Sequence, residues 1–534
     1  MPSSTRPFTT TLFRILLLPA LLSYLYLNFY PAINDCAFPP AQRVRTTCSG
    51  RTCKNTTINA GKAPFRLLAL ADPQLEGDTS LPPALRNSGS AWGGLGILWD
   101  HASAGDMEGL RRDFPVIFQG YRKKLDLWGT DLYLAHVFSR AKSWASPTHT
   151  VVLGDLVGSQ WIGDEEFESR AERFWGRVLG GRMVRVPDFV MAKENEEGHE
   201  GEVLGEGDGA REWRRRVIAV AGNHDVGYAG DLNDARVERF ERSFGRVNWE
   251  VAFRLPNSSL DEGNSFAKQI SLDFYDGPGP QPELRLVVLN SMNLDEPALR
   301  PALREQSLAF MRESLCNPDR FNDNDEHSAT VLLTHIPLHK PTGLCVDGPS
   351  FSYFSNGGGI REQNHLSEDL SKELVGCLQR KRSAVILNGH DHEGCNSLHY
   401  REPLSSTSSI TNAGDEGDGE GIQQTIPYRE FSPDQETSSS FVREITVRSM
   451  MGSYGGHAGF LSGWFDVEKG KWEFEYASCG FGVQHIWWVC NVLLYLEAGL
   501  GGVWVVGMLV GGVVGEGDGR GRRSGKDGGK EKRA

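Results

Sequence analysis

The sequence predicts an α/β protein built around a layered sheet, with an apolar helix at each end of the chain. Across residues 64–482, short apolar runs of strand length alternate with amphipathic or irregular stretches, which is the pattern of a sheet covered by helices. The stretch Tyr121–Trp144 has apolar residues at mixed spacings of three and four and is expected to be a helix packed on that sheet. The expected strands are Phe65–Ala71, Thr150–Leu153, Val217–Ala221, Leu284–Leu289, Thr330–Leu333, Ala384–Leu387, Phe441–Val447 and Phe460–Val467.

The N-terminal apolar segment Ile15–Ile33 contains nineteen residues without a charge and follows Arg6 and Arg14. That length crosses roughly 30 Å of hydrocarbon as a helix. We therefore expect residues 1–34 to form a short cytosolic N-terminus and an uncleaved signal anchor. A cleaved signal peptide is the alternative, which the length of the run and the lack of a small-residue cleavage site disfavour.

The C-terminal segment 486–515 carries a single charge, Glu497, and precedes a basic tail over residues 516–534. We expect a second transmembrane helix and a cytosolic tail, with a Gly-rich disordered tail as the alternative. If both segments span, the flanking Lys and Arg residues place both termini in the cytosol and the chain between them in the lumen. The acceptor sequons at Asn55 and Asn257 agree with a glycoprotein of the secretory pathway.

Charge and cysteine content narrow the class of protein further. With 56 Lys and Arg against 69 Asp and Glu, the formal charge is -13, which excludes a partner held through many nucleic-acid phosphates. The nine cysteines are an odd number and cannot all pair internally. We expect residues 35–63 to be a lumenal linker that contains Cys36, Cys48 and Cys53, whose spacing does not match a zinc site. Disulfides in an oxidising lumen are favoured over free thiols, with a pairing that the sequence leaves open.

Two interior segments depart from the strand and helix pattern. Residues near 193–211 and 405–440 are acidic or rich in Ser and Gly, and they lack the apolar residues needed to offset the entropy of ordering. They are expected to be mobile insertions in a domain that otherwise covers residues 64–482.

The chemistry is expected at the ends of the apolar runs, because five of them end in polar side chains. In an open α/β sheet the carboxyl ends of the strands border one crevice, so these side chains should converge. Each of Gly154, Gly222 and Gly389 lies next to one of them and lets the backbone approach the site closely. The residues concerned are Asp72, Gln74, Asp155, Asn223, His224, Asp225, His335, His390 and His392.

The donor set itself indicates metal ions. Two carboxylates, one carboxamide and three imidazoles, without a thiolate, suit divalent ions such as manganese, zinc or iron. Six strong ligands exceed what one catalytic zinc takes from a protein, so two divalent ions are expected. A carboxylate in the middle of the set, Asp155, is placed to bridge them.

The strings Gly154-Asp155, Gly222-Asn-His-Asp225 and Gly389-His-Asp-His392, in this order, resemble the calcineurin-like metallophosphoesterase superfamily. The resemblance covers about Phe65 to Cys479 and implies a layered α/β/β/α sandwich with a dinuclear centre. By motif, it implies that Asp72, Asp155 and His392 bind a first metal. The second metal would be bound by Asp155, Asn223, His335 and His390.

The resemblance also implies a catalytic role for His224, which would stabilise the phosphoryl transition state or protonate the leaving oxygen, with Asp225 orienting it. Most of the superfamily has Asp-x-His at the first motif, where this chain has Gln74. An amide oxygen is a weaker ligand than an imidazole, so the first metal should bind less tightly or recruit water.

Longer strings, among them LADPQLEGD, VAGNHDVGY and NGHDHEGC, resemble the fungal branch of membrane enzymes that remodel glycosylphosphatidylinositol (GPI) anchors, a Ted- or Cdc-type branch. That branch also carries Gln at the first motif. The resemblance implies a manganese-dependent phosphodiesterase of the endoplasmic reticulum membrane with a lumenal catalytic domain. Its substrate would be an ethanolamine-phosphate side branch on a mannose of the GPI glycan, and its partners GPI-anchored proteins and cargo receptors of ER-to-Golgi transport.

Two other functions stay open at this point. The first is a phosphomonoesterase acting on phosphoproteins or nucleotides, which a lumenal topology disfavours. The second is a non-catalytic cargo-trafficking protein in which Gln74 has disabled the metal centre.

Overall fold

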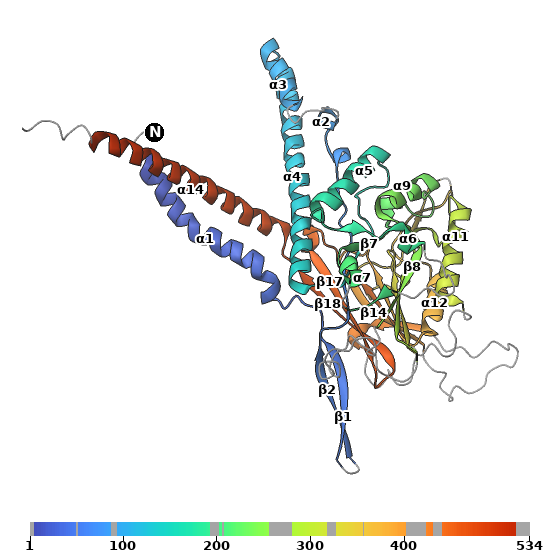
Figure 1. Cartoon of the computed structure of the whole chain (residues 1–534). Coiled ribbons are helices and arrows are strands. Elements are labelled where there is room, and N and C mark those ends of the chain that lie inside the picture. The colour runs from blue at the N-terminus through green and yellow to red at the C-terminus, as the bar shows by residue number, and fades with distance from the viewer. Residues whose placement is uncertain are drawn as a thin grey trace, which may run out of the picture. The chain divides into compact units, whose positions relative to one another are not determined.

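The computed structural model describes residues 5–49, 52–86, 93–192, 202–205, 208–255, 280–317, 327–355, 357–401, 423–430 and 441–519 (Figure 1). The chain divides into two compact units, one made of Met1–Tyr30 and Gln484–Ala534 and the other of Pro31–Val483. The two expected insertions, near 193–211 and 405–440, lie mostly outside the described residues, and so does the sequon at Asn257.

The first unit consists of two long helices, α1 (Thr5–Ile33) and α14 (Gln484–Gly519). The stretches Thr10–Ile33 and Gln484–Val506 are long and apolar enough to cross a membrane. Within this unit the rings of Phe13 and Trp504 stack with centroids 6.2 Å apart. These helices coincide with the two segments expected to span, and they indicate that the protein is membrane-associated.

The second unit contains two large sheets. Among the described residues, one sheet has six strands in the order β18-β17-β3-β4-β7-β5 and the other has eight in the order β15-β14-β16-β13-β10-β9-β8-β6. The neighbours β3, β4 and β7 run parallel, as do β9, β10, β13 and β16. The strands of the first sheet are β3 (Phe65–Leu70), β4 (His149–Leu153), β5 (Val184–Arg185), β7 (Arg216–Val220), β17 (His457–Asp466) and β18 (Lys471–Gly480). Those of the second are β6 (Glu202–Val203), β8 (Trp249–Arg254), β9 (Glu283–Val288), β10 (Ser328–Leu333), β13 (Ala384–Asn388), β14 (Cys395–Arg401), β15 (Gln423–Pro427) and β16 (Phe441–Thr446).

Helices cover the outer faces of both sheets. The long helix α4 (Met107–Ala145) contacts β17 of the first sheet, and α12 (Glu368–Gln379) contacts β16 of the second. Helix α5 contacts α9, and Figure 1 shows α11 and α12 on one side of the unit. The expected α/β/β/α sandwich is therefore confirmed. The remaining helices are α2 (Pro83–Arg86), α3 (Gly93–Ala104), α5 (Asp164–Arg173), α6 (Asp188–Met191), α7 (Asp208–Trp213), α8 (Asn223–Val226), α9 (Asp234–Phe244) and α11 (Pro301–Met311).

The core lies between the two sheets. Every second residue of a strand points to the same face, so Leu67 and Ala69 of β3 meet residues such as Leu286 of β9 and Val331 of β10 in one buried cluster. All eight expected strands are present, and the clustered residues explain why: each strand needs an apolar face toward the other sheet. The carboxyl ends of the parallel strands are thereby fixed relative to one another.

The segment expected to be a linker, residues 35–63, instead contains a β-hairpin. Strand β1 (Ala41–Ser49) pairs antiparallel with β2 (Thr52–Gly61), in a register that sets Cys48 opposite Cys53. A short two-stranded sheet of β11 (Phe351–Tyr353) and β12 (Ile360–Gln363) lies later in the chain. The hairpin sequence is mostly polar and has few large apolar residues, which is why apolar periodicity does not reveal it.

The expectation of disulfides is confirmed within the described residues. Cys36 pairs with Cys479, Cys316 with Cys377, and Cys345 with Cys395. The bond between Cys36 and Cys479 joins the two ends of the second unit, three residues after α1 ends and five residues before α14 begins. Disulfides of this kind persist in oxidising compartments.

One polar residue stands out in the core of the second unit. His149, at the start of β4, is surrounded by the rings of Phe65, Trp213 and Phe253, with centroids 4.7–5.4 Å away. Its Nδ1 lies 2.9 Å from the Thr148 hydroxyl, and its Nε2 has no hydrogen-bond partner among the described residues. Burial lowers the pKa of His149 to about 3, so the imidazole is neutral in the folded protein at pH 7.

We predict that replacing His149 by Phe removes part of the acid sensitivity of the fold. A histidine whose folded pKa is depressed takes up a proton only on unfolding, so it destabilises the protein as the pH falls below about 6.5. The difference in unfolding free energy between His149→Phe and the unchanged protein should shift by about 2 kcal/mol in favour of the variant between pH 6.5 and pH 5. Denaturant unfolding in detergent, followed at both pH values, measures it. A difference that does not change with pH would contradict the assignment.

Candidate metal centre and active site

Each predicted site residue lies where a parallel strand ends. In the six-stranded sheet, Asp72 and Gln74 follow β3, Asp155 follows β4, and Asn223 follows β7. In the eight-stranded sheet, His335 follows β10, while His390 and His392 follow β13. The sandwich therefore brings both sets of strand ends to one place, as expected for ligands of an α/β sheet.

The turns that present these side chains have unusual backbone geometry. Asp72, Gln74, Asp155 and His390 all have φ between +43° and +74°, a region that residues other than glycine rarely adopt. Such strain persists where the surrounding structure enforces it, and it is common at functional sites. Gly222 shows how tight the packing is, because a Cβ at this position would lie 2.2 Å from the backbone nitrogen of Asp155.

One group of donors gathers around the side chain of Asn223. Its Oδ1 lies 3.1 Å from Nε2 of His335 and 3.0 Å from Nδ1 of His390. The other nitrogen of each ring faces a backbone carbonyl: Nδ1 of His335 lies 2.7 Å from Leu153 O, and Nε2 of His390 lies 3.0 Å from Gln363 O. A carbonyl only accepts, so these outer nitrogens carry the protons. This is the arrangement by which metal-binding histidines are held in the correct tautomer.

That arrangement leaves lone pairs pointing at one another. Burial lowers the pKa of His390 to about 3 and that of His335 below its ordinary value, so both rings are neutral and carry one proton each. Their inner nitrogens then face the Asn223 oxygen, which is also an acceptor. Three acceptors that meet without a donor are stabilised by a cation between them.

A second group gathers around Asp155. The Gln74 amide donates from Nε2 to Asp155 Oδ2 at 3.0 Å and lies 3.2 Å from Nε2 of His392. Turning the amide by 180° directs its oxygen to the same point, where it serves as a ligand. Asp155 also links the two groups, since its Oδ1 lies 3.4 Å from Nε2 of His335. The carboxylate predicted to bridge two ions therefore lies between the two groups of donors.

Asp72 completes the set. Its Oδ1 accepts a hydrogen bond from the backbone N–H of His390 at 3.1 Å, whereas its buried Oδ2 has no partner among the described residues. Burial, together with the nearby Asp155 carboxylate, raises the pKa of Asp72 well above its usual range. Ligand atoms of Asp72, Asp155 and His335 all lie within 4.8 Å of one another. Buried carboxylates this close need compensating positive charge, so the residues present fit divalent cations.

His224 lies at the edge of this site. Its backbone N–H donates to Asp155 Oδ1 at 2.8 Å, and its Nε2 lies 3.8 Å from Asp155 Oδ2. About a third of the side chain is exposed, whereas His335 is fully buried. Its imidazole can therefore reach a molecule that enters from solvent.

The role predicted for Asp225 is corrected by the structure. Its carboxylate does not hold the His224 ring, whose Nδ1 has no hydrogen-bond partner among the described residues. Instead Oδ1 accepts from Val157 N at 3.0 Å and Oδ2 accepts from Gly222 N at 2.9 Å. Asp225 thus ties the loop after β4 to the loop after β7, so it is a positioning residue.

Sequence reasoning missed a buried ionic network beneath the site. Glu444 of β16 is fully buried and accepts from Lys340 Nζ at 2.8 Å, Asn388 Nδ2 at 2.7 Å and Leu338 N at 2.9 Å. Its other oxygen lies 2.7 Å from Nε2 of His399. The signal in the sequence was a glutamate in the middle of a predicted strand, which requires partners if it is buried.

The position of this network shows how it supports the site. Lys340 and Leu338 belong to the loop that begins with His335, and Asn388 precedes the loop with His390 and His392. Glu444 therefore connects two ligand-bearing loops from below. Burial alone would raise the pKa of Glu444, but Lys340 and His399 outweigh it and hold this pKa well below its usual range.

Comparison with known families agrees with this geometry. The profile of the calcineurin-like phosphoesterase family matches residues 126–394, a range that includes Asp155, Asn223, His335, His390 and His392. The chain belongs to this family, and it is a metal-dependent phosphoester hydrolase.

Individual relatives specify the branch of the family. Protein TED1 of Saccharomyces cerevisiae is 30% identical over 449 residues, which cover 74% of this chain and 82% of that protein. An uncharacterised protein of Schizosaccharomyces pombe is 26% identical over 70% of this chain and 79% of its own length. Metallophosphoesterase 1 of Pongo abelii is 25% identical over 52% of this chain and 58% of its own length. The predicted resemblance to the Ted-type branch is thereby confirmed.

We predict that Lys340→Met destabilises the protein strongly, because it leaves Glu444 buried without its cation. Breaking a buried pair by removing one partner costs about 3–5 kcal/mol. Adding Glu444→Gln to Lys340→Met should recover much of that loss, since no buried charge then remains unpaired. Denaturant unfolding of the two single variants and the double variant forms a double-mutant cycle. Additive losses, with no coupling between the two positions, would show that the pair does not act as one unit.

Proposed function

We propose that this protein is a dinuclear metal-dependent phosphodiesterase that removes an ethanolamine-phosphate side branch from a mannose of the GPI glycan. The observation that supports a site for two metal ions is that two groups of donors share Asp155. Asp72, Gln74, Asp155 and His392 would hold one ion, and Asp155, Asn223, His335 and His390 the other. A mixed nitrogen and oxygen set without thiolate favours manganese, with zinc or iron as alternatives.

The chemistry divides between the ions and the protein side chains. When bound, such ions act as Lewis acids toward phosphoryl oxygens and make a water-derived nucleophile available at neutral pH. The residues of this chain orient the ligands, since the carbonyls of Leu153 and Gln363 fix the two imidazoles and Asp225 fixes two loops. His224, partly exposed beside Asp155, is placed to give a proton to the leaving sugar oxygen.

The proposed compartment is the lumen of the endoplasmic reticulum. Two candidate membrane spans flank the phosphoesterase unit, and basic residues outside them favour cytosolic termini. The disulfides within the unit suit an oxidising lumen, where thioredoxin and glutathione do not keep thiols reduced. This topology brings the site to lumenal substrates and keeps it from cytosolic phosphoproteins.

The proposed substrate rests on the resemblance of the motifs to the GPI-remodelling branch and on the similarity to TED1. GPI-anchored proteins would be the partners in the reaction. Removal of the side branch would release them for transport to the Golgi. A membrane-anchored hydrolase suits a substrate that is itself held in the membrane.

We predict that Asp155→Ala and Asn223→Ala abolish turnover of a phosphodiester while leaving the fold intact. Both remove ligands without removing core packing, so near-normal thermal unfolding should accompany the loss. His224→Ala should retain metal and lose about 10²- to 10⁴-fold in kcat, the usual contribution of a general acid. Asp369→Asn, an exposed position on α12, is the matched control and should keep full activity. Full activity in Asp155→Ala would contradict the assignment of the site.

We predict that cells lacking this protein accumulate GPI glycans that retain ethanolamine-phosphate. Mass spectrometry of the released glycans measures it, and complementation should succeed with the unchanged protein and fail with Asn223→Ala. Purified enzyme should hydrolyse a phosphodiester in preference to the matching monoester. Hydrolysis of the monoester alone would favour a phosphomonoesterase. Two bound metals without turnover of either ester would favour a trafficking role.

A further inference from the structure

A long apolar stripe lies exposed on helix α4 of the phosphoesterase unit. Residues 107, 110, 114, 118, 125 and 128 fall within less than a quarter turn of one helix face, given 3.6 residues per turn. Five of these side chains are exposed and one is half-buried, and Phe118 is 62% accessible. The stripe consists of Met107, Leu110, Phe114, Phe118, Leu125 and Trp128.

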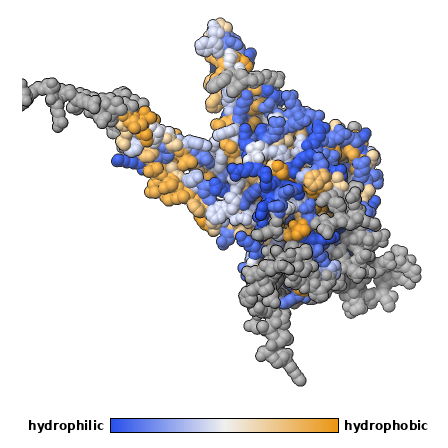
Figure 2. Space-filling model, in the orientation of Figure 1, coloured by the Kyte–Doolittle hydropathy of each residue, from blue (hydrophilic) through white to orange (hydrophobic). Residues whose placement is uncertain are grey.

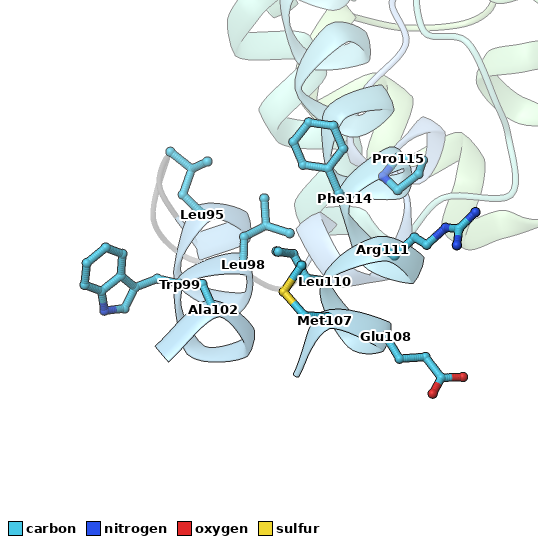
Figure 3. Close-up of a pocket in the computed structure, with 10 residues that line it drawn as sticks. All are labelled: Leu95, Leu98, Trp99, Ala102, Met107, Glu108, Leu110, Arg111, Phe114 and Pro115. Carbon is cyan, nitrogen blue, oxygen red and sulfur yellow. The ribbon is translucent and has the colours of Figure 1, made fainter. Parts of the chain in front are cut away.

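Helix α3 extends the apolar surface at the N-terminal end of the stripe. Figure 3 shows Leu95, Leu98 and Trp99 of α3 beside Met107, Leu110 and Phe114 of α4, around an open groove of about 1280 Å³. Trp99 is 73% exposed and points outward. Figure 2 shows hydrophobic residues gathered on the helical hairpin that α3 and α4 form. A contiguous exposed patch of this kind marks an interaction site.

The edges of the stripe carry positive charge. The segment 107–128 contains five Lys and Arg against three Asp and Glu, in a chain whose formal charge is -13. Arg111 and Arg122 are exposed and follow one edge of the stripe on the helix surface, and Lys124 lies at the other. Aromatic and aliphatic residues on one face with Lys and Arg at its margins are typical of a helix that lies in a membrane interface.

Within the phosphoesterase unit, a hydrogen bond joins α4 to the segment that leads into α14, and a disulfide joins that segment to the residues that follow α1. The hydroxyl of Tyr133, on α4, donates a hydrogen bond to the carbonyl of Gly482, two residues before α14 begins. The disulfide from Cys36 to Cys479 joins the residues that follow α1 to the same segment, with Cα atoms 5.5 Å apart. From Tyr133 back to Met107 the helix covers about 39 Å, at 1.5 Å per residue.

We propose that the stripe on α4, with the apolar residues of α3, lies in the interface of the same membrane that the two terminal helices cross. The apolar side chains would be buried among the headgroups and upper acyl chains, while Arg111 and Arg122 face the phosphates. The helical hairpin of α3 and α4 would then be a third point of attachment to the membrane, besides α1 and α14, and would fix the orientation of the phosphoesterase unit. This inference does not depend on the identity of the substrate.

The direct test is hydrophobic photolabelling of the full chain. The protein is reconstituted in vesicles of phosphatidylcholine and phosphatidylserine, irradiated with an aryl diazirine that partitions into the bilayer, and digested with trypsin. Mass spectrometry should find adducts on the peptide 113–122, which contains Phe114 and Phe118, as well as on α1 and α14. The peptide that contains Phe189, a side chain 65% exposed on α6, is the internal control and should be labelled several-fold less.

A variant tests the cause without altering the reporter peptide. Met107→Glu with Leu125→Glu puts carboxylates on the stripe on either side of peptide 113–122, and labelling of that peptide should fall several-fold. Phe189→Glu should leave it unchanged, and both variants should hydrolyse a soluble phosphoester normally, which shows that they are folded.

Three results would overturn the proposal. Adducts confined to α1 and α14 would show that the stripe does not reach lipid. Equal labelling of the peptides with Phe118 and Phe189 would show that the reagent reports exposure alone. An unlabelled stripe whose peptides cross-link to a second copy of the chain would identify a dimer interface instead.

Discussion

The structure depends on holding two carboxylates, Asp72 and Asp155, buried and close together at the junction of two sheets. Burial and the Asp155 carboxylate raise the pKa of Asp72, whose Oδ2 has no hydrogen-bond partner among the described residues. The neighbouring ligand atoms, the oxygen of Asn223 and the inner nitrogens of His335 and His390, are acceptors. Divalent cations would resolve this conflict. The site therefore fits cations, because burying its charged groups without them would carry a large desolvation penalty.

Several parts of the fold serve to keep that geometry. The core between the sheets fixes the strand ends, and the left-handed backbone at Asp72, Gln74, Asp155 and His390 turns the side chains inward. Below them, Asp225 and Glu444 each join two ligand-bearing loops through hydrogen bonds to buried N–H groups. Buried hydrogen bonds of this kind hold the connected loops in one arrangement.

The sequence predicted the elements that obey simple periodicity. Strands such as β10 and β13 are mostly apolar, and a histidine follows each of them two residues after its end, so both the strand and its ligand were visible. Contacts between distant residues were not visible: Lys340 and Glu444 are 104 residues apart, and Asp225 binds backbone atoms that no motif specifies. Helix α4 begins at Met107, with Asp106 as its N-cap, fourteen residues before the predicted start, because its first turns face solvent with apolar side chains. The hairpin of β1 and β2 was not predicted because it has too few large apolar residues to show a periodic pattern.

The most direct test of the central claim is anomalous diffraction from crystals of the protein prepared with manganese, measured at the manganese absorption edge. The account predicts two anomalous peaks, roughly 3.5–4 Å apart, one beside Asp72, Gln74 and His392 and the other beside Asn223, His335 and His390, with Asp155 between them. A single peak, or peaks away from these side chains, would contradict it.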